Sequence, residues 1–424
     1  MKTFIQLARQ TSTIAPLAGL KPDDVIKTCK YIEKGSCFAL DGVRSCISGT
    51  INAPLLVATE ELNAGTVTYE KVVERRQALI AAINGLVEGD TGSCLTCANL
   101  VEKPFKDVDL SCLGGEPLTA GMNIQYYTAC NQRCIFCCFA KTNQLIKAQY
   151  DMLEYLELFR KAGKLRGNNW IDFSGGEPAM LKEFDKVLNY LLDHNLGTVV
   201  VYSNASLFSQ KIHDALKNDR IILTTSLDTG LASTYAKIRR SDTFPKVIRN
   251  LIRYRNTGTQ RLWLKYVICE ENRTEDDLWS FVLTMLALRP NKVLICPDFP
   301  YGEREIPEAT VAFAARLWHA MEQLVGLTPV DYTTDFADPK WIKYHADLCA
   351  ALEKVRKEEP FGKAGQVQRL DYPGVAHVVQ QRIGRVRGAL WRSSLRKRWI
   401  PDRSAREQRV MNLYRRTLGL LLPQ

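Results

Sequence analysis

The chain has 424 residues, of which 46% are hydrophobic and 24% are charged. This length exceeds what one core usually organises, so we expect one large domain with further segments attached. No stretch reaches the roughly 18 apolar residues of a membrane span, and Arg9 lies where a secretion signal would be apolar. These features exclude a membrane-spanning segment and predict a cytoplasmic protein.

Thirteen cysteines are present. The cytosol keeps thiols reduced, so clustered cysteines in such a protein more often bind metal or do chemistry than form disulfides. The spacing of the cysteines is therefore the feature most informative about function.

Residues 1–117 show little long periodicity apart from one predicted helix at 69–86. They contain six of the cysteines, namely Cys29, Cys37, Cys46, Cys94, Cys97 and Cys112. We expect a cysteine-rich amino-terminal extension.

Residues 118–326 alternate apolar, β-rich runs with amphipathic stretches. Strands are predicted at 123–127, 170–173, 198–202, 221–227, 263–268 and 292–295. Helices are predicted at 152–162, 181–192, 244–254, 274–288 and 307–324. Six βα units predict an α/β fold with parallel strands, either an open doubly wound sheet or a full or partial barrel. In each arrangement the functional residues follow the carboxyl ends of the strands.

Residues 327–424 are predicted to be a helical, basic carboxy-terminal region. Its segment 361–424 has 14 Lys or Arg against 3 Asp or Glu, which gives +11, the formal net charge of the whole chain. Such a segment can contact an anionic surface such as lipid, nucleic acid or an acidic partner. A solvated helical face whose long side chains cover apolar surface explains the same pattern.

Cys130, Cys134 and Cys137 follow the first strand of the alternating region with C-x3-C-x2-C spacing. Thiolates bind zinc and iron-sulfur clusters, and both commonly take four ligands. Three thiolates on one loop leave one position open for another molecule unless a distant residue fills it. A structural zinc site completed by a remote cysteine is the alternative, although such sites favour paired C-x2-C knuckles.

This loop resembles the cluster-binding motif of the radical S-adenosylmethionine (SAM) superfamily, with Phe136 as the aromatic residue before the third cysteine. The resemblance covers residues 118–326. It implies a partial (β/α)6 barrel, a 4Fe-4S cluster on the three cysteines, and SAM at the open iron.

Later strand ends resemble further landmarks of the same superfamily. In similar enzymes a GGEP turn meets the methionine amine of SAM, and its glycines allow close approach of the backbone. A polar residue, Asn204, follows the third predicted strand. Ser226 and Asp228, at the end of the fourth, resemble the pair that binds the SAM ribose. The implied SAM-binding residues are Phe136, Ser174, Gly175, Gly176, Glu177, Asn204, Ser226 and Asp228.

The extension resembles the auxiliary-cluster segments of SPASM-type enzymes, although those usually lie after the barrel. Similar amino-terminal segments have a Cys-x-Tyr start, a second cysteine after a short hairpin and a C-x2-C pair before the barrel. This pattern selects Cys29, Cys46, Cys94 and Cys97, which could hold a second 4Fe-4S cluster. A structural zinc ion with the same ligands is the alternative, and Cys112 is the best substitute ligand.

The resemblance implies that a partner such as flavodoxin or ferredoxin reduces the cluster, that SAM is cleaved, and that a 5′-deoxyadenosyl radical abstracts hydrogen from a substrate. We expect a peptide or sugar-containing substrate and either oxidation or epimerisation. Cys269 and Cys296, after the fifth and sixth predicted strands, are candidate hydrogen donors, with structural packing as the alternative. Lys265 and Tyr202 are candidates for contacting SAM or substrate inside the barrel.

Two other functions fit parts of the sequence. A nucleic-acid (tRNA) modifying radical SAM enzyme is favoured only by the basic segment 361–424. A non-enzymatic zinc-binding scaffold would account for the cysteines, but it has no need of the GGEP turn.

Overall fold

The computed structural model describes residues 15–46, 53–97, 99–114, 121–142, 148–298, 305–333 and 339–358. The basic segment 361–424 therefore lies outside the described residues, and the predicted contact with an anionic surface stays a prediction. No helix in the described part of the chain is both long and apolar enough to span a membrane.

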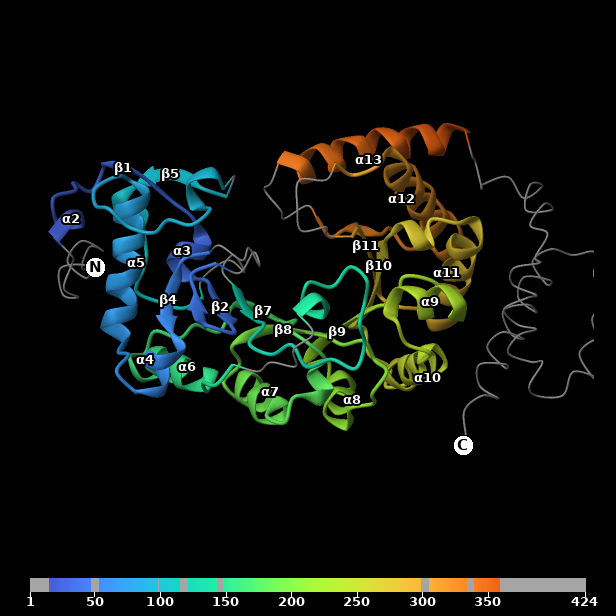
Figure 1. The fold of residues 1–424 in the computed structure, drawn as a ribbon, viewed down its shortest axis with the longest axis horizontal. Helices are drawn as coiled ribbons and strands as arrows, with labels where there is room; N and C mark the ends of the chain where they lie inside the picture. The colour runs from blue at the N-terminus through green and yellow to red at the C-terminus, as the bar shows by residue number, and fades with distance from the viewer. Residues whose placement is uncertain are drawn as a thin grey trace, which may run out of the picture.

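Six parallel strands, β6 to β11, form the centre of a larger sheet (Figure 1). They are β6 (Gly121–Ile124), β7 (Asn169–Phe173), β8 (Gly197–Tyr202), β9 (Ile221–Ser226), β10 (Leu262–Ile268) and β11 (Lys292–Pro297). Each pairs with the next in chain order, and every predicted strand coincides with one of them to within a few residues. The predicted α/β fold with parallel strands is confirmed.

Helices connect these strands and cover one face of the sheet. They are α6 (Met152–Lys161), α7 (Phe184–Asp193), α8 (Gln210–Lys217), α9 (Ala232–Arg239), α10 (Phe244–Arg255), α11 (Glu275–Leu288) and α12 (Glu308–Ala320). Figure 1 shows α7, α8 and α10 along the outer side of β7, β8 and β9. The sequence did not predict α8 and α9. Both are eight residues long, too short for a clear apolar period.

The sheet continues beyond the six strands at both edges, and among the described residues its ten strands do not close on themselves. At one edge β2 (Ser36–Ala39) pairs in parallel with β6, followed by the antiparallel β3 (Gly42–Arg44) and β4 (Leu55–Ala58). At the other edge β12 (Val330–Asp331) pairs in parallel with β11. This open, barrel-like sheet fits the predicted partial barrel, while the predicted domain limits at 117 and 326 stay predictions.

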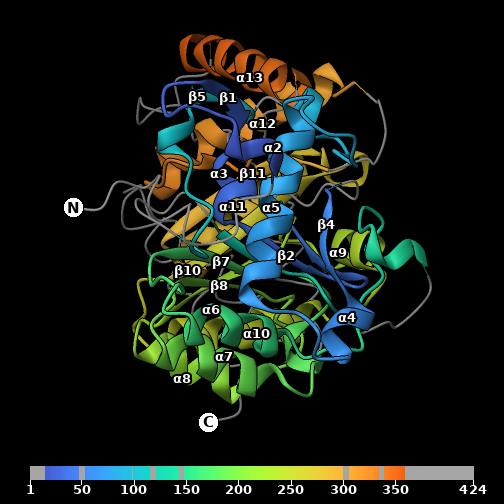
Figure 2. The same ribbon diagram turned by 90° about the vertical axis from the view of Figure 1, so that its left-hand side faces the viewer.

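The remaining amino-terminal elements lie beside the β2 edge. They are α2 (Ala15–Ala18), β1 (Val25–Thr28), α3 (Lys30–Lys34), α4 (Thr59–Asn63), α5 (Tyr69–Ile83) and β5 (Val101–Pro104), with β1 and β5 forming a separate antiparallel pair. Figure 2 looks onto this part and shows α5 running lengthwise in front of β2. The side chain of Arg76 on α5 is buried and donates hydrogen bonds to the carbonyls of Ile32 and Gly35 at the end of α3. This contact fixes α5 against the segment that leads into β2. The last described element is α13 (Pro339–Glu358), which packs on α12.

Candidate active site

The loop of Cys130, Cys134 and Cys137 follows β6 and lies against the end of α9. The backbone N–H groups of Arg133 and Ile135 donate to the carbonyls of Arg239 and Ile238 at 3.2 and 3.0 Å. All three cysteines are partly buried, and the electrostatic influence of Cys134 and Cys137 on Cys130 places their sulfurs close together. The structure therefore brings the three predicted ligands together at the carboxyl end of the strands.

Two side chains from other elements donate hydrogen bonds to these sulfurs. Asn204, just after β8, has its Nδ2 atom 3.6 Å from Cys130 Sγ. Arg239, the last residue of α9, has its Nη1 atom 3.2 Å from Cys134 Sγ. Burial raises the pKa of Cys130 to about 11 and also raises that of Cys134, which Arg239 opposes. Thiolates at this loop therefore need positive charge beside them, which a bound metal cluster and Arg239 supply.

Arg239 was not predicted as a site residue, yet it connects several that were. It forms a buried ion pair with Asp228, donates to the Ser226 carbonyl at 2.7 Å, and lies 5.0 Å from the centre of the Phe136 ring. Asp228 also accepts a 2.9 Å hydrogen bond from the backbone N–H of Val267. Both carboxylate oxygens of Asp228 thus bind protein groups, which makes it a positioning residue for Arg239. The ribose contact predicted for Ser226 and Asp228 stays a prediction.

Glu177 of the GGEP turn is 1% exposed and joins three segments. Its carboxylate accepts hydrogen bonds from Ser203 Oγ at 2.8 Å, the Asn204 N–H at 2.7 Å and the Ala179 N–H at 3.2 Å. Its own backbone N–H donates to the Ala129 carbonyl at 2.7 Å, directly before Cys130. Glu177 therefore holds the cysteine loop and the β8 end in a fixed relation, and its predicted contact with SAM is not tested.

The glycines of the GGEP turn were expected to allow close approach of SAM, but in the structure they are required for a contact within the protein. A Cβ atom on Gly176 would lie 2.2 Å from the Ala129 carbonyl oxygen, and one on Gly175 would lie 2.5 Å from the Tyr127 carbonyl oxygen. The close approach is thus to the backbone of the cysteine loop. A ligand contact by the same turn stays a prediction.

Replacing Gly176 with alanine is expected to destabilise the protein by about 1–3 kcal/mol, because two backbone segments must separate. It should also lower the iron content after reconstitution, since Cys130 follows the displaced Ala129. The matched control is Gly19→Ala, where a Cβ atom meets nothing within 4 Å. Equal unfolding free energies and iron contents for the two variants would contradict this account of the turn.

Asp172 on β7 is a half-buried carboxyl near the site. Burial raises its pKa to about 7 from an ordinary value of 3.8, against the hydrogen bond from Trp170 Nε1 to Asp172 Oδ1 at 3.0 Å. Between these pH values the unfolded chain has lost the proton that the folded protein keeps, so the free energy of unfolding falls as pH rises. We expect a fall on the order of 2–4 kcal/mol between about pH 4 and 7. Denaturant titrations of Asp172→Asn should show a flatter profile, and an unchanged slope would contradict the raised pKa.

The predicted auxiliary ligands Cys29, Cys46, Cys94 and Cys97 come from three segments of the amino-terminal part. Burial, together with the neighbouring Cys29, Cys46 and Cys97, raises the pKa of Cys94 to about 12, which places the four thiols in one neighbourhood. The Cys29 sulfur accepts a 3.5 Å hydrogen bond from the Ile32 N–H at the start of α3.

The sulfur of Cys112, the substitute ligand, donates a 3.1 Å hydrogen bond to the Gly114 carbonyl oxygen. Across the described ranges, no three Cys, His, Asp or Glu side chains are arranged to hold a single metal ion. A single zinc ion requires sulfurs roughly 3.8 Å apart, given Zn–S bonds of about 2.3 Å, whereas a multi-iron cluster separates its thiolates more widely.

Cys269 and Cys296 lie together on the side of the sheet that faces the cysteine loop. They form a small apolar cluster with Val267, against which Phe136 and Tyr332 pack. Cys269 follows β10 as predicted, but Cys296 lies within β11, in register with Val267, because the strand extends to Pro297. Burial raises the pKa of Cys296 to about 11, so its sulfur stays a thiol at neutral pH.

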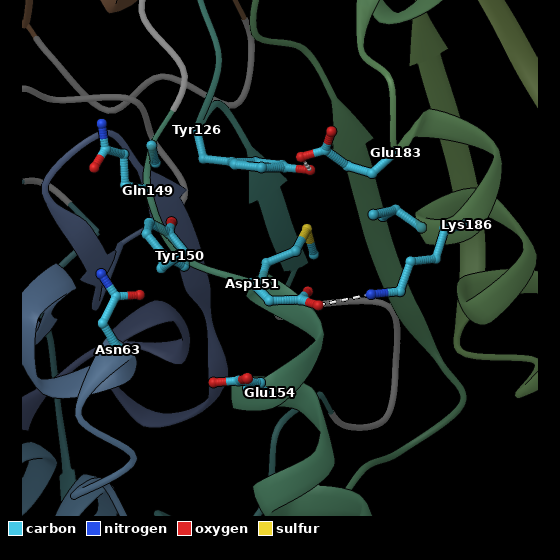
Figure 3. Close-up of a pocket in the computed structure, with 11 residues that line it drawn as sticks. Asn63, Tyr126, Gln149, Tyr150, Asp151, Glu154, Glu183 and Lys186 are labelled. Atoms are coloured by element: carbon cyan, nitrogen blue, oxygen red, sulfur yellow. Dashed lines mark hydrogen bonds and ion pairs between the residues drawn. The ribbon is translucent and has the colours of Figure 1, made fainter.

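A cavity of about 480 Å³ lies elsewhere, between α4 and the starts of α6 and α7 (Figure 3). Its lining includes Asp151, Glu154, Glu183 and Lys186, and Lys186 Nζ lies 2.7 Å from Asp151 Oδ2. The lining contains none of the predicted site residues. This cavity is therefore separate from the cysteine loop.

Residues 124–279 match the family model described as the radical SAM superfamily. The match includes the three-cysteine loop, the GGEP turn and the Asp228 and Arg239 pair. The chain contains a radical SAM domain. The predicted resemblance to this superfamily is thereby confirmed for residues 124–279, and enzymes of this superfamily bind a 4Fe-4S cluster and SAM.

Among curated relatives, a GTP 3′,8-cyclase of Clostridium botulinum (strain Okra) is 26% identical over 178 residues, which are 41% of this chain and 54% of the relative. A probable GTP 3′,8-cyclase of Saccharolobus solfataricus is 24% identical, over 44% of this chain and 59% of the relative. The chain thus spans little more than half the length of these relatives. A solved structure, Streptococcus suis SuiB bound to S-adenosylmethionine, is similar at 15% identity with a TM-score of 0.39 over 48% of this chain and 47% of SuiB.

Proposed function

We propose that this radical SAM enzyme reductively cleaves SAM and uses the 5′-deoxyadenosyl radical to abstract hydrogen from a peptide or sugar-containing substrate. The observation that carries the proposal is the three-cysteine loop, whose sulfurs accept hydrogen bonds from Asn204 and Arg239 beside the GGEP turn. When bound at this loop, the 4Fe-4S cluster supplies the electron that cleaves SAM.

The chain's own residues bind and orient these groups. Cys130, Cys134 and Cys137 would ligate three irons, and the N–H groups of Asn204 and Arg239 stabilise the ligating sulfurs. We infer that SAM binds between the GGEP turn and the ends of β8 to β11. The residues that we assign to it are Phe136, Ser174, Gly175, Gly176, Glu177, Asn204, Ser226 and Asp228.

The proposal is tested by anaerobic reconstitution, chemical reduction and quantification of 5′-deoxyadenosine and methionine. We expect both products from the wild type and neither from Cys134→Ala. Cys349→Ala is the control, because Cys349 is exposed on α13, away from the loop. A wild type whose loop cysteines bind a cluster but which cleaves no SAM would contradict the proposal.

We also propose that Cys29, Cys46, Cys94 and Cys97 hold a second 4Fe-4S cluster. Support comes from the shared neighbourhood of the four thiols. A fully ligated cluster can relay electrons or accept one from a substrate radical. A structural zinc ion is the competing occupant.

The substrate class is supported by one finding. The relatives are named GTP 3′,8-cyclase, and GTP is a sugar-containing nucleotide. This keeps a nucleotide, and with it the nucleic-acid modifying alternative, among the candidates. Salt-sensitive RNA binding that is lost on deleting residues 361–424 would favour that alternative. A non-enzymatic scaffold is not compatible with membership of this enzyme class.

Replacing Cys296 with alanine distinguishes the two outcomes proposed for the substrate radical. Epimerisation needs a hydrogen donor, so Cys296→Ala or Cys269→Ala should abolish it, whereas oxidation should continue at a rate within a few-fold of wild type. Analysis of the products formed in deuterated water distinguishes epimerisation from oxidation. Epimerised product at the wild-type rate from both variants would remove these thiols as donors.

A reducing partner such as flavodoxin or ferredoxin and a cytoplasmic location complete the proposal. The clustered cysteines fit this location, because a reducing compartment keeps thiols free to bind metal.

A further inference from the structure

Alternation along the strands gives the sheet a helix-covered outer face and an inner face. Ile171, Val201 and Leu264 belong to the main hydrophobic core beneath the helices. Their neighbours Asp172, Tyr202 and Lys265 therefore point to the inner face. Asp172 and Tyr202 are partly exposed there, so solvent reaches the inner face.

Four inner-face side chains form a group that we call the inner cluster: Asp172, Tyr202, Lys265 and Tyr332. The Tyr202 and Tyr332 hydroxyl oxygens are 3.3 Å apart, and Lys265 Nζ lies 3.6 Å from the centre of the Tyr332 ring. Tyr202 also hydrogen-bonds to Asp172. The inner cluster therefore combines one ammonium group with two phenol hydroxyls that hydrogen-bond to each other and a carboxyl that accepts from Trp170 and Tyr202.

Thr224 on β9 adds a polar atom that the protein does not satisfy. It is 1% exposed, and its Oγ1 atom has no hydrogen-bond partner among the described residues. Its strand register places it between Tyr202 on β8 and Trp263 on β10, and so beside the inner cluster. Buried hydroxyls are nearly always paired, so this one points to a ligand that completes the site.

The inner cluster lies one layer below the candidate SAM site. Lys265 precedes Val267 by two residues on the same face, a separation of about 7 Å along the strand. Val267 packs with Cys296 and Phe136 of the cysteine loop. On the other side, the Trp170 and Trp263 rings, with centroids 6.1 Å apart, cover the inner face toward the start of the strands.

We propose that the inner cluster binds an anionic group, a carboxylate or a phosphate, of the molecule that the radical attacks. Lys265 supplies the charge, and the unpaired Thr224 hydroxyl donates a hydrogen bond to the anion. Burial raises the pKa of Asp172 to about 7, so a large fraction of this carboxyl is uncharged at neutral pH and does not repel an anion. This assignment rests on the proposed function, because it places the substrate beneath SAM.

The test uses full-length, anaerobically reconstituted protein and two probes, inorganic phosphate and succinate, each titrated with and without saturating SAM. Binding is read from the unfolding midpoint and by calorimetry. We expect at least one probe to bind the wild type in the presence of SAM, with about ten- to one-hundred-fold weaker binding to Lys265→Gln and weaker binding to Thr224→Val. The two probes distinguish a phosphate from a carboxylate site.

Lys292→Gln is the matched control, because Lys292 Nζ also lies over an aromatic ring of the sheet, 4.1 Å from the centre of Trp263, which precedes Lys265 by two residues on β10. This variant should bind the probe as the wild type does. Equal binding to wild type and Lys265→Gln, or no binding of either probe, would overturn the proposal. Loss of SAM affinity in Lys265→Gln would also overturn it, because Lys265 would then serve the SAM carboxylate. Failure of SAM cleavage is measured separately and would remove only the proposed function.

Discussion

Replacing Asp228 with alanine is expected to destabilise the protein by about 3–5 kcal/mol, because it leaves a buried guanidinium without its counter-ion. Arg239 and Asp228 have side chains that are 6% and 1% exposed. The substitution also removes the acceptor for the Val267 N–H and places alanine at a backbone φ of +63°, which Asp and Asn tolerate better. Urea unfolding at pH 7 measures the loss.

Two comparisons isolate the cause of this loss. Asp228→Asn keeps an acceptor and the backbone preference while removing the charge, so its effect should fall between those of wild type and alanine. Asp23→Ala breaks an exposed ion pair with Lys106, whose side chains are 82% and 50% exposed, and should cost less than about 1 kcal/mol. If Asp228→Ala were no more destabilising than Asp23→Ala, Asp228 would not be the anchor of Arg239.

Replacing Cys130, Cys134 and Cys137 together with alanine is expected to lower the iron content from about eight to about four per chain and to abolish SAM cleavage. The four irons that remain belong to the proposed auxiliary site. Replacing Cys29, Cys46, Cys94 and Cys97 should likewise remove about four irons and leave the loop cluster in place. Iron, sulfide and zinc analyses after anaerobic reconstitution provide the counts.

The control for the loop variant is Cys138→Ala. Cys138 is adjacent to a predicted ligand, and two adjacent residues rarely both reach one metal, so its iron content should match the wild type. A fall from about four irons to none in the triple variant would remove the auxiliary cluster from the account. One zinc per chain that is lost only with the amino-terminal cysteines would assign that site to zinc.

The sequence predicted the central strands and the three-cysteine loop because both depend on local pattern. Apolar, β-rich runs define β6 to β11, and the loop cysteines lie within eight residues of one another. Asn204, Glu177 and Asp228 were likewise found because each follows a strand. Their predicted SAM contacts are not tested by the structure.

The sequence could not predict contacts between distant segments. Arg239 is 105 residues from Cys134 and lies on the unpredicted helix α9, so nothing in the local pattern indicated its role. The parallel pairing of β2 with β6 likewise joins the amino-terminal part to the sheet across more than 80 residues. The requirement for glycine at Gly175 and Gly176 also has a different cause from the predicted one, because only the structure shows the backbone of the cysteine loop packed against them.

The central claim is that Cys130, Cys134 and Cys137 hold a cluster with an iron open to SAM. Electron paramagnetic resonance of the reduced, reconstituted protein tests it most directly, with spectra recorded before and after SAM is added. The account predicts a signal that changes on SAM addition in the wild type and in the variant lacking Cys29, Cys46, Cys94 and Cys97. That signal should be absent from the triple loop variant. A spectrum that SAM leaves unchanged, or a SAM-sensitive signal that persists without the loop cysteines, would contradict it.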